Sequence, residues 1–373
     1  MTTRVLWLVK GLGPGGAEQL LVNQARVRDR ARFDVRAAYL VPWKNHLVPR
    51  LEEQGVPVTC LESRREWDLR WAWRLRRDLR ARPVDVIHNH SPLVASITRV
   101  LVRTLPRRDR PALVYTEHNR WPRHNRFTRL ANRLTFRLDD LQLCVSEDVR
   151  ETLPPRLRER VRVLVHGVDV DAIRAHRAAR EQVRRELDVG EEEIVIGIVA
   201  NFRREKAYEV WLDAAATALR SSLPLRFVSV GQGPLEAEMR ARVATMGLGD
   251  RVQLLGYRED AVRVMSAFDI FTLSSRHEGL PVALMDALAL GLPVVATAVG
   301  GIGQAVTDGV EGRLVPADDP AALAAAYVEV ASDRRRLGEM AEAAAKRGRS
   351  FGMEGPARQL EALYASAAAS NRR

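Results

Sequence analysis

Short apolar runs rich in β-branched residues alternate along this chain with longer amphipathic segments, and this alternation constrains the fold more than any other feature. In the first half the apolar runs read RVLWLV, FDVRAAYLV, VPVTC, VDVIHNH, ALVYTEH and LQLCVS. Such alternation is typical of βαβ units with a parallel sheet. The runs are almost continuously apolar, as expected when helices cover both faces of the sheet.

The pattern pauses at residues 163–170 (VLVHGVDV), and a charged segment follows. A second series then begins: IVIGIVAN, LRFVSVG, VQLLG, DIFTLSS, PVVAT and RLVP. We expect the α/β class, with two Rossmann-like domains whose parallel sheets face each other across a cleft. The expected division is one Rossmann-like domain at 1–170, a second at 171–350, and a helix at 351–373 that crosses back to the first domain. Ligands of such sheets bind outside the carboxyl ends of the strands.

The chain of 373 residues carries a net charge of +12, which favours anionic partners. Nucleic acid is not expected among them, because the charge is spread over both domains and no nucleic-acid-binding module is visible. Cys60 and Cys144 lie in apolar stretches and are interpreted as buried thiols in a reducing compartment. The uncharged residues 287–303 are interrupted by glycines and a proline, so they do not predict a membrane span. We therefore predict a cytoplasmic protein, with a peripheral position at the inner membrane face left open.

A glycine-rich loop follows the first predicted strand directly. It reads GLGPGG and includes Gly15 and Gly16 just before a helix. Glycines allow a backbone to approach a phosphate, and a helix N-terminus favours an anion. Binding of NAD is rejected, because the second strand ends in PWK without the acid that would hold a ribose. A plain tight turn is the alternative.

Two motifs of the second half place charged residues after predicted strands. In NFRREK, Arg203 and Lys206 are three residues apart and are suited to holding a diphosphate, although a solvated helix start is the alternative. In RHEGLPV, Pro281 fits the first position of a helix that Gly291 ends. Glu278 before that helix and Asp286 within it can accept hydrogen bonds from a sugar and a ribose, or simply complement the helix dipole.

Histidines end two neighbouring predicted strands. They are His88 and His90 in VIHNH and His118 in YTEHN. Zinc is conceivable, but there is no nearby cysteine and no H-E-x-x-H, so no metal is predicted. Contact of these histidines with a substrate is the preferred interpretation.

Arginines and aromatic residues are interleaved in two segments. In residues 64–82 the apolar positions Trp67, Trp71, Ala72, Leu75 and Leu79 share one helix face, while Leu69 and Trp73 fall among arginines. The second set comprises Arg123, Arg126, Arg129, Arg133 and Arg137 with Trp121, Phe127, Leu130 and Leu134. Such surfaces suit an anionic membrane. The alternative is a solvated helix face.

Taken together, these motifs resemble family 4 of the retaining glycosyltransferases, which have the two-Rossmann B-type fold (GT-B). The resemblance is strongest from VGQGPLEAEM through LGYREDAVRVMSAFDIFTLSSRHEGLPVALMDALALGLPVVATAVGGIGQAVTDGVEGRLVPADD, and VHGVD resembles the family's interdomain linker. It implies transfer of a hexose-type sugar from a nucleotide-diphosphate sugar, UDP favoured and GDP the alternative, to a glycan, lipid-linked or small-molecule acceptor. It also implies front-face displacement without metal or cofactor.

The resemblance further implies a role for each matching residue. The domain at 1–170 would bind the acceptor and the domain at 171–350 the nucleotide sugar. The glycine loop lies near the donor diphosphate and the acceptor, His118 lies at the reaction centre, a basic pair holds the diphosphate, and the loop acid contacts the donor sugar. The donor-binding set is Gly15, Gly16, Arg203, Lys206, Glu278, Leu280, Pro281, Val282 and Asp286, and the catalytic set is His118, Glu278, Arg203 and Lys206.

Three positions depart from the family pattern: Asp286 replaces the usual glutamate, Ala207 a common glycine, and Gln304 a common acid. Two rival functions remain. One is a nucleotide-sugar epimerase or hydrolase of the same fold, and the other is a non-catalytic protein that binds a nucleotide or a membrane.

Overall fold

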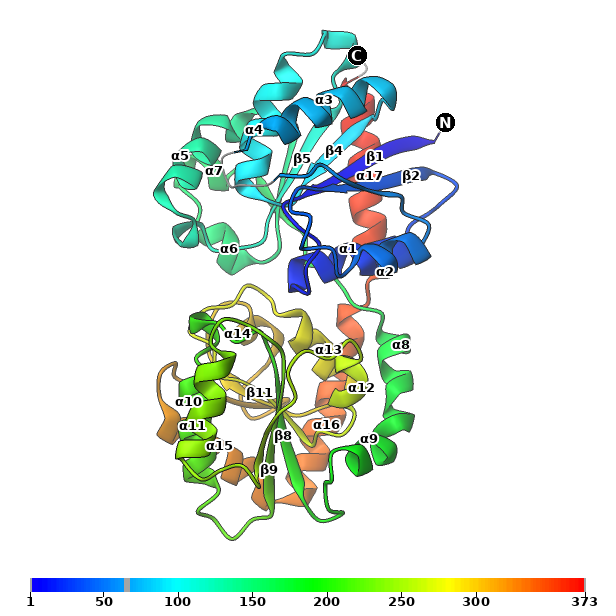
Figure 1. Cartoon of the computed structure of the whole chain (residues 1–373). Coiled ribbons are helices and arrows are strands. Elements are labelled where there is room, and N and C mark those ends of the chain that lie inside the picture. Colours follow the sequence, from blue (N-terminus) through cyan, green and yellow to red (C-terminus); the bar gives the residue numbers. More distant parts are fainter. Residues whose placement is uncertain (1, 64–67, 372–373) are drawn as a thin grey trace. The chain divides into compact units, whose positions relative to one another are not determined.

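The computed structural model describes residues 2–63 and 68–371. Trp67 therefore lies outside the described residues. The chain divides into two compact units (Figure 1). The first unit consists of Met1–Gly167 together with Met353–Arg373, and the second of Val168–Gly352.

A parallel sheet forms the centre of the first unit, with the described strands in the order β3-β2-β1-β4-β5-β6-β7. These strands are β1 (Thr3–Val9), β2 (Phe33–Tyr39), β3 (Val58–Cys60), β4 (Val86–Asn89), β5 (Ala112–Glu117), β6 (Leu141–Cys144) and β7 (Val161–Val163). The helices are α1 (Gly16–Val27), α2 (Val48–Glu53), α3 (Arg70–Ala81), α4 (Pro92–Arg103), α5 (Arg126–Thr135), α6 (Glu147–Glu151), α7 (Pro155–Arg158) and α17 (Glu354–Asn371). The short edge strand β7 lies where the sequence pattern pauses.

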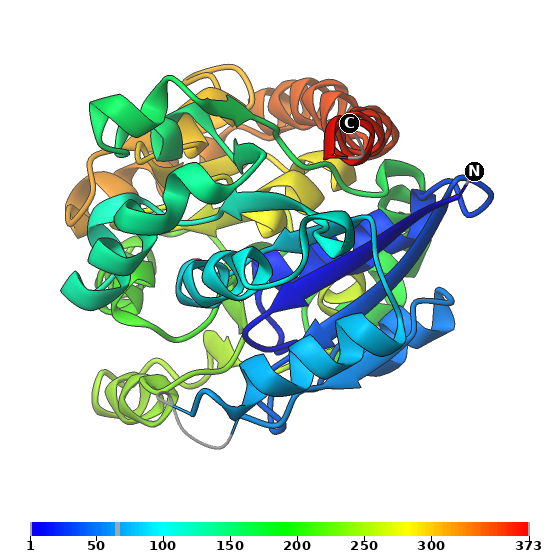
Figure 2. The ribbon, with the colours of Figure 1, turned by 90° about the horizontal axis from the view of Figure 1, so that it is seen from above.

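Both faces of this sheet are buried, which explains the unbroken apolar runs. Along β1, Val5 and Trp7 pack in one core with Tyr364 of α17, whereas Leu6 packs in another with Leu75 of α3. Figure 2 looks down on this unit and shows the red α17 on one side of the blue β1 and the light-blue α3 on the other.

The second unit contains a parallel sheet with the described strands in the order β10-β9-β8-β11-β12-β13. They are β8 (Ile194–Val199), β9 (Leu225–Val230), β10 (Val252–Leu254), β11 (Ile270–Leu273), β12 (Val294–Thr297) and β13 (Gly312–Val315). The helices are α8 (Val170–Ala175), α9 (Arg180–Glu186), α10 (Tyr208–Ala218), α11 (Glu236–Thr245), α12 (Ala261–Met265), α13 (Val282–Leu290), α14 (Ile302–Ala305), α15 (Pro320–Ser332) and α16 (Arg334–Gly348).

The strand order reverses at one point in each sheet, between β1 and β4 in the first and between β8 and β11 in the second. In open α/β sheets, ligands bind beyond the carboxyl ends of the strands at such a switch point. The loops that follow β1, β4, β8 and β11 are therefore the places to look for a site.

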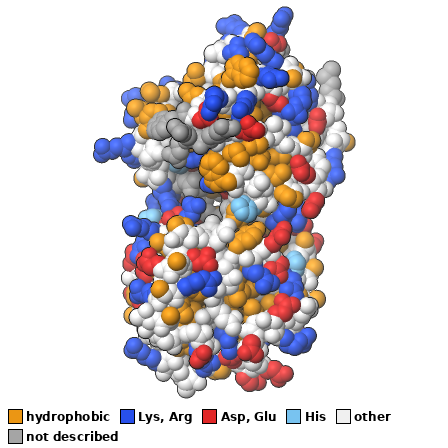
Figure 3. Space-filling model, in the orientation of Figure 1, with side chains coloured by type: hydrophobic (Ala, Val, Ile, Leu, Met, Phe, Trp, Pro, Cys, Tyr) orange, Lys and Arg blue, Asp and Glu red, His pale blue; other side chains and the backbone are white. Residues whose placement is uncertain are grey.

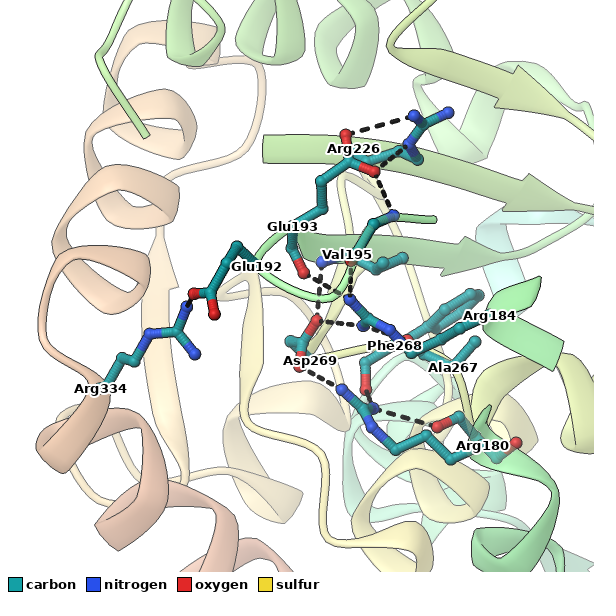
Figure 4. Close-up of polar contacts among 12 residues, drawn as sticks. Arg180, Arg184, Glu192, Glu193, Val195, Arg226, Ala267, Phe268, Asp269 and Arg334 are labelled. Carbon is teal, nitrogen blue, oxygen red and sulfur yellow. Dashed lines mark hydrogen bonds and ion pairs between the residues drawn. The ribbon is translucent and has the colours of Figure 1, made fainter. Parts of the chain in front are cut away.

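The amino-terminal edge of the second sheet is fastened by a polar network around Asp269 (Figure 4). Its carboxylate accepts hydrogen bonds from Arg180 at 2.6 Å, from Arg184 at 3.1 Å and from the backbone N–H of Val195 at 2.8 Å. The network ties α9 to the start of β8 and β11, at the edge of the sheet opposite to the carboxyl-end loops.

Both cysteines were predicted to be buried. Cys144 is buried as predicted, but Cys60 is only partly buried, and both thiols are free. The prediction of full burial was wrong for Cys60 because β3 lies at the edge of the sheet, where one side lacks a neighbouring strand.

None of the described helices combines the length and the apolar character needed to cross a bilayer.

Candidate functional site

The loop after β8 presents the predicted basic pair. Arg203 has extended backbone and is exposed, and a 3₁₀ turn, η5 (Arg204–Lys206), follows it. Ala207 then takes the left-handed conformation, with φ 48°, before α10 begins. This conformation costs a residue with a Cβ about 1 kcal/mol, and glycine takes it freely. The turn therefore accounts for the glycine that the family pattern favours at this position.

The loop after β11 brings Glu278 against this basic segment. The Glu278 carboxylate is 9% exposed, and its Oε1 accepts hydrogen bonds from Lys206 Nζ at 2.5 Å and from Ser275 Oγ at 2.6 Å. Ser274 Oγ also donates to the backbone carbonyl of Lys206 at 2.8 Å. Two loops that are far apart in the sequence are thus joined at the switch point of the second sheet.

The helix after Glu278 begins at Val282, so Pro281 is the residue before the helix and not its first residue as predicted. The reason is its extended ψ of 130°, which turns the chain into the helix. The Gly279 carbonyl accepts a hydrogen bond from Gly301 N–H at 2.7 Å, and a Cβ on Gly301 would lie 2.2 Å from that carbonyl oxygen. Only glycine at 301 permits the two loops to pack this closely.

Two predicted donor-binding groups stay unpaired. Among the described residues, neither the Arg203 guanidinium nor the Asp286 carboxyl has a hydrogen-bond or ion-pair partner. Asp286 lies on α13, where burial raises the pKa of its carboxyl to about 7. Leu280 and Val282 flank Pro281 and are partly buried. Gln304 is exposed.

In the first unit, the glycine loop links β1 to α1. The helix begins at Gly16, and Gly15 before it has extended backbone. The loop is held by a hydrogen bond from Leu12 N–H to the Lys44 carbonyl at 2.7 Å. The loop begins at Lys10, and the backbone N–H of Lys10 donates a hydrogen bond at 3.0 Å to Ser91 Oγ in the loop after β4.

A cluster of histidines lies at the same edge of the first sheet. His118 follows β5, and its Nε2 lies 3.1 Å from His90 Nδ1, while its ring stacks on that of His166 with centroids 6.0 Å apart. Burial lowers the pKa of His118 to about 3 and that of His166 to about 4, so both imidazoles are neutral at physiological pH. Among the described residues, no group of three potential ligands is arranged to hold a metal ion.

His88 does not contact solvent, which contradicts the expectation that it faces a substrate. It is fully buried, with Nδ1 2.6 Å from Tyr364 Oη and Nε2 2.7 Å from Thr116 Oγ1. The period-2 pattern of β4 places His88 and His90 on one side of the strand, but α17 covers that side over His88. Tyr364 lies 276 residues away in the sequence, and no local pattern indicated its contact with His88.

The two arginine-rich helices differ in what they expose. On α3, Trp71 and Leu75 are buried as predicted, while Trp73 is 65% exposed. Of the aromatic residues in the second set, Trp121 is buried. Three apolar residues of α5 are exposed: Phe127 (52%), Leu130 (56%) and Leu134 (74%).

Two family models match the chain. Residues 14–172 match the model described as Glycosyltransferase Family 4, and residues 193–333 match the model described as Glycosyl transferases group 1. The chain belongs to the family 4 glycosyltransferases. The predicted resemblance is confirmed. The matched segments contain the loops that follow β4, β8 and β11, whereas β1 (Thr3–Val9) lies before the first of them.

Known relatives show how far the likeness extends. D-inositol 3-phosphate glycosyltransferase of Corynebacterium urealyticum is 33% identical over 220 residues, 56% of this chain and 52% of that protein. Lipopolysaccharide core biosynthesis mannosyltransferase LpsB of Rhizobium meliloti is 29% identical over 212 residues, 55% of this chain and 60% of that protein. The match thus spans little more than half the length of these curated relatives.

The solved structure of Anabaena Alr3699/HepE in complex with UDP and glucose has a TM-score of 0.85 at 21% identity, covering 98% of this chain and 99% of that chain. This likeness confirms the predicted fold class of two Rossmann-like α/β domains of the B type.

Proposed function

We propose that this glycosyltransferase transfers a hexose-type sugar, with retention of configuration, from a nucleotide-diphosphate sugar to a glycan, lipid-linked or small-molecule acceptor. The observation that carries the proposal is the contact between Lys206 and Glu278 at the switch point of the second sheet, beside the unpaired Arg203. A cation that binds phosphate and an acid that binds hydroxyls are what a sugar diphosphate requires on its two sides.

Lys206 and Glu278 both keep hydrogen-bonding groups available for a ligand. The Lys206 ammonium has three N–H donors and gives one to Glu278, so the others are available to diphosphate oxygens. Both bonds to Glu278 end on Oε1, and Oε2, which has no partner among the described residues, is left to accept a sugar hydroxyl. Arg203 and the free N–H groups at the start of α13 add positive potential where the diphosphate leaves.

The donor and acceptor are proposed from relatives. The fold neighbour from Anabaena was solved with UDP and glucose, so a UDP-hexose is the first donor to test and a GDP-sugar the second. LpsB is named for lipopolysaccharide core biosynthesis, which favours a glycan acceptor. We propose that the glycine loop with Gly15 and Gly16 lies near the donor diphosphate and the acceptor, that His118 lies at the reaction centre, and that no metal or cofactor takes part.

Removal of either basic side chain tests the diphosphate assignment. Arg203→Ala and Lys206→Ala are each expected to lower kcat/KM by ~10² or more with the best donor of a nucleotide-sugar panel, as for loss of one charge contact in the transition state. Arg204→Ala is the matched control, because Arg204 is an exposed arginine of the same loop and its side chain has no partner among the described residues. Near-wild-type turnover in Arg203→Ala or Lys206→Ala would refute the assignment.

The same panel separates the rival functions. An epimerase or hydrolase forms product without an acceptor, whereas a transferase needs one. A non-catalytic nucleotide-binding protein shows thermal stabilisation by nucleotides and no product under either condition.

We further propose that helix α5 contacts an anionic membrane surface at the cytoplasmic face. Phe127, Leu130 and Leu134 recur at helical spacing and are exposed, and arginines lie between them. Apolar residues flanked by arginines are suited to anionic headgroups. Figure 3 shows Lys and Arg side chains spread over both units among acidic ones, so positive charge alone does not single out a membrane-binding surface.

Sedimentation with vesicles tests the membrane contact. The double variant Phe127→Ala, Leu130→Ala is expected to bind anionic phosphatidylglycerol vesicles more weakly, by about tenfold or more. The reason is that an apolar side chain contributes roughly 1.5–3 kcal/mol when it is fully buried, here in the membrane. Trp73→Ala tests α3 in the same way. Val310→Ala, at an apolar residue of the second unit that is 48% exposed, is the control. Unchanged sedimentation of both test variants would remove the membrane proposal.

A further inference from the structure

The contact between His90 and His118 allows the proton positions on the reaction-centre histidine to be worked out. His90 Nδ1 and His118 Nε2 lie 3.1 Å apart. Both imidazoles are neutral, because burial lowers the pKa of each. One of the two nitrogens therefore carries the shared proton and the other accepts it.

The buried surroundings of His90 decide between these two arrangements. His90 is nine-tenths buried, and its Nε2 is enclosed without a hydrogen-bond partner among the described residues. If His118 were the donor, the proton of His90 would reside on Nε2 as a buried N–H without an acceptor. Buried N–H groups without partners are rarer than acceptors with an unused lone pair. The arrangement in which His90 Nδ1–H donates to His118 Nε2 leaves only such a lone pair.

His90 cannot itself reach a substrate. The cavity that it lines with His118 and His166 measures about 10 Å³. This is barely the space of one water molecule. The backbone N–H of His90 donates a hydrogen bond to the Leu8 carbonyl at 2.9 Å, and the His90 ring packs on that of His88 with centroids 3.9 Å apart. His90 is therefore a fixed group that acts on its surroundings through His118.

The outer nitrogen of His118 is the one that remains open. His118 is only partly buried. Its Nδ1 has no hydrogen-bond partner among the described residues, and it is not one of the buried polar atoms that lack a partner, so it is accessible to solvent. With Nε2 occupied by the proton of His90, the proton of neutral His118 resides on Nδ1.

We propose that His90 is a positioning residue that fixes His118 in the Nδ1–H tautomer, so that His118 presents a hydrogen-bond donor, and not a base, to a substrate oxygen. The inference rests on the proposed transferase function for its catalytic consequence, but the tautomer itself does not. A hydrogen-bond donor at this position binds a sugar or acceptor oxygen. In the transfer, the bond from the anomeric carbon of the donor sugar to the diphosphate oxygen breaks, and the acceptor oxygen forms its bond to that carbon. The acceptor hydroxyl gives its proton to the diphosphate, which departs with that proton.

The tautomer is measured directly by imidazole ¹⁵N NMR on the full-length, ligand-free protein at pH 7, with His118 assigned by the loss of its signals in His118→Phe. We expect protonated Nδ1 and unprotonated Nε2 in the wild type. In His90→Phe, which keeps a ring but has no donor, we expect the Nε2–H tautomer that histidine prefers in water. A wild-type Nε2–H tautomer would overturn the proposal whether or not the protein has transferase activity, and an inactive protein with the Nδ1–H tautomer would contradict only the proposed function.

Kinetics test the consequence. His90→Phe is expected to lower kcat about tenfold with donor KM within twofold, whereas His90→Asn, whose amide N–H can replace Nδ1–H, is expected to restore most of the loss. In a His118→Ala background, His90→Phe should have no further effect on kcat, because the two residues act as one unit. Equal losses in both backgrounds, with melting temperatures unchanged, would overturn the positioning role.

Discussion

At the scale of single residues, the carboxyl of Asp286 is the group of the donor-binding set whose ionisation is most disturbed. Burial raises its pKa from 3.8 to about 7, so the folded protein holds a proton that the unfolded chain releases between these values. The contribution of Asp286 to the unfolding free energy is therefore largest at low pH and falls as pH rises from about 4 to 7.

This shift predicts the pH dependence of nucleotide binding. If Asp286 accepts hydrogen bonds from a ribose as a carboxylate, binding must remove its proton, so UDP affinity should fall by up to about tenfold per pH unit below 7. Calorimetric titration with UDP between pH 5.5 and 8.5 measures the effect. Asp286→Asn should show weaker binding with this dependence removed. A variant that keeps the wild-type pH dependence would assign it to another group.

The residues of the candidate site were predictable singly, but not as pairs. Arg203, Lys206 and Glu278 stand out because each follows an apolar strand, where charge is unexpected unless it serves a ligand. The hydrogen bond between Lys206 and Glu278 spans 72 residues and depends on β8 and β11 being neighbours. Ser275 and Tyr364 have common side chains in unremarkable contexts, so their roles as partners of Glu278 and His88 required the tertiary structure.

At the scale of elements, the period-2 and near-continuous apolar patterns predicted strands well because these sheets are buried on both faces. The prediction of strands and buried residues was weakest at the edges of the sheet. The edge strand β7 has only three residues and little apolar pattern, and Cys60, at the end of the edge strand β3, is only partly buried. Polar networks that fasten elements, such as that of Asp269, leave no periodic signal.

The Asp269 network predicts a local stability effect. Asp269→Ala would leave Arg184, which is 7% exposed, without its carboxylate, so we expect a loss of about 3 kcal/mol in the unfolding free energy of the second unit. Glu192→Ala is the matched control, because its ion pair with Arg334 in the same region is largely exposed (Figure 4) and should contribute little. Chemical denaturation measures both variants. Equal effects would contradict this account.

At the scale of the whole molecule, the two units have separate cores and separate sheets. We expect two calorimetric unfolding transitions. At 100 times its Kd, UDP should stabilise only the second unit, by about 2.7 kcal/mol. This corresponds to a rise of roughly 5–10 °C in the melting temperature of that unit. Asp269→Ala, which should lower the same transition, identifies it. A rise confined to the other transition would place the nucleotide in the first unit.

Helix α17 belongs to the first unit but is synthesised after the whole of the second unit. Its Tyr364 and Leu360 complete a core begun by β1, yet all of Val168–Gly352 must be synthesised before them. At about 5–20 residues per second, roughly 10 to 40 s pass between the synthesis of Gly167 and that of Leu360, and β1 and β4 have one apolar side uncovered during that time. The unit whose synthesis begins first is thus completed last, and during that interval its uncovered apolar side is a surface prone to aggregation.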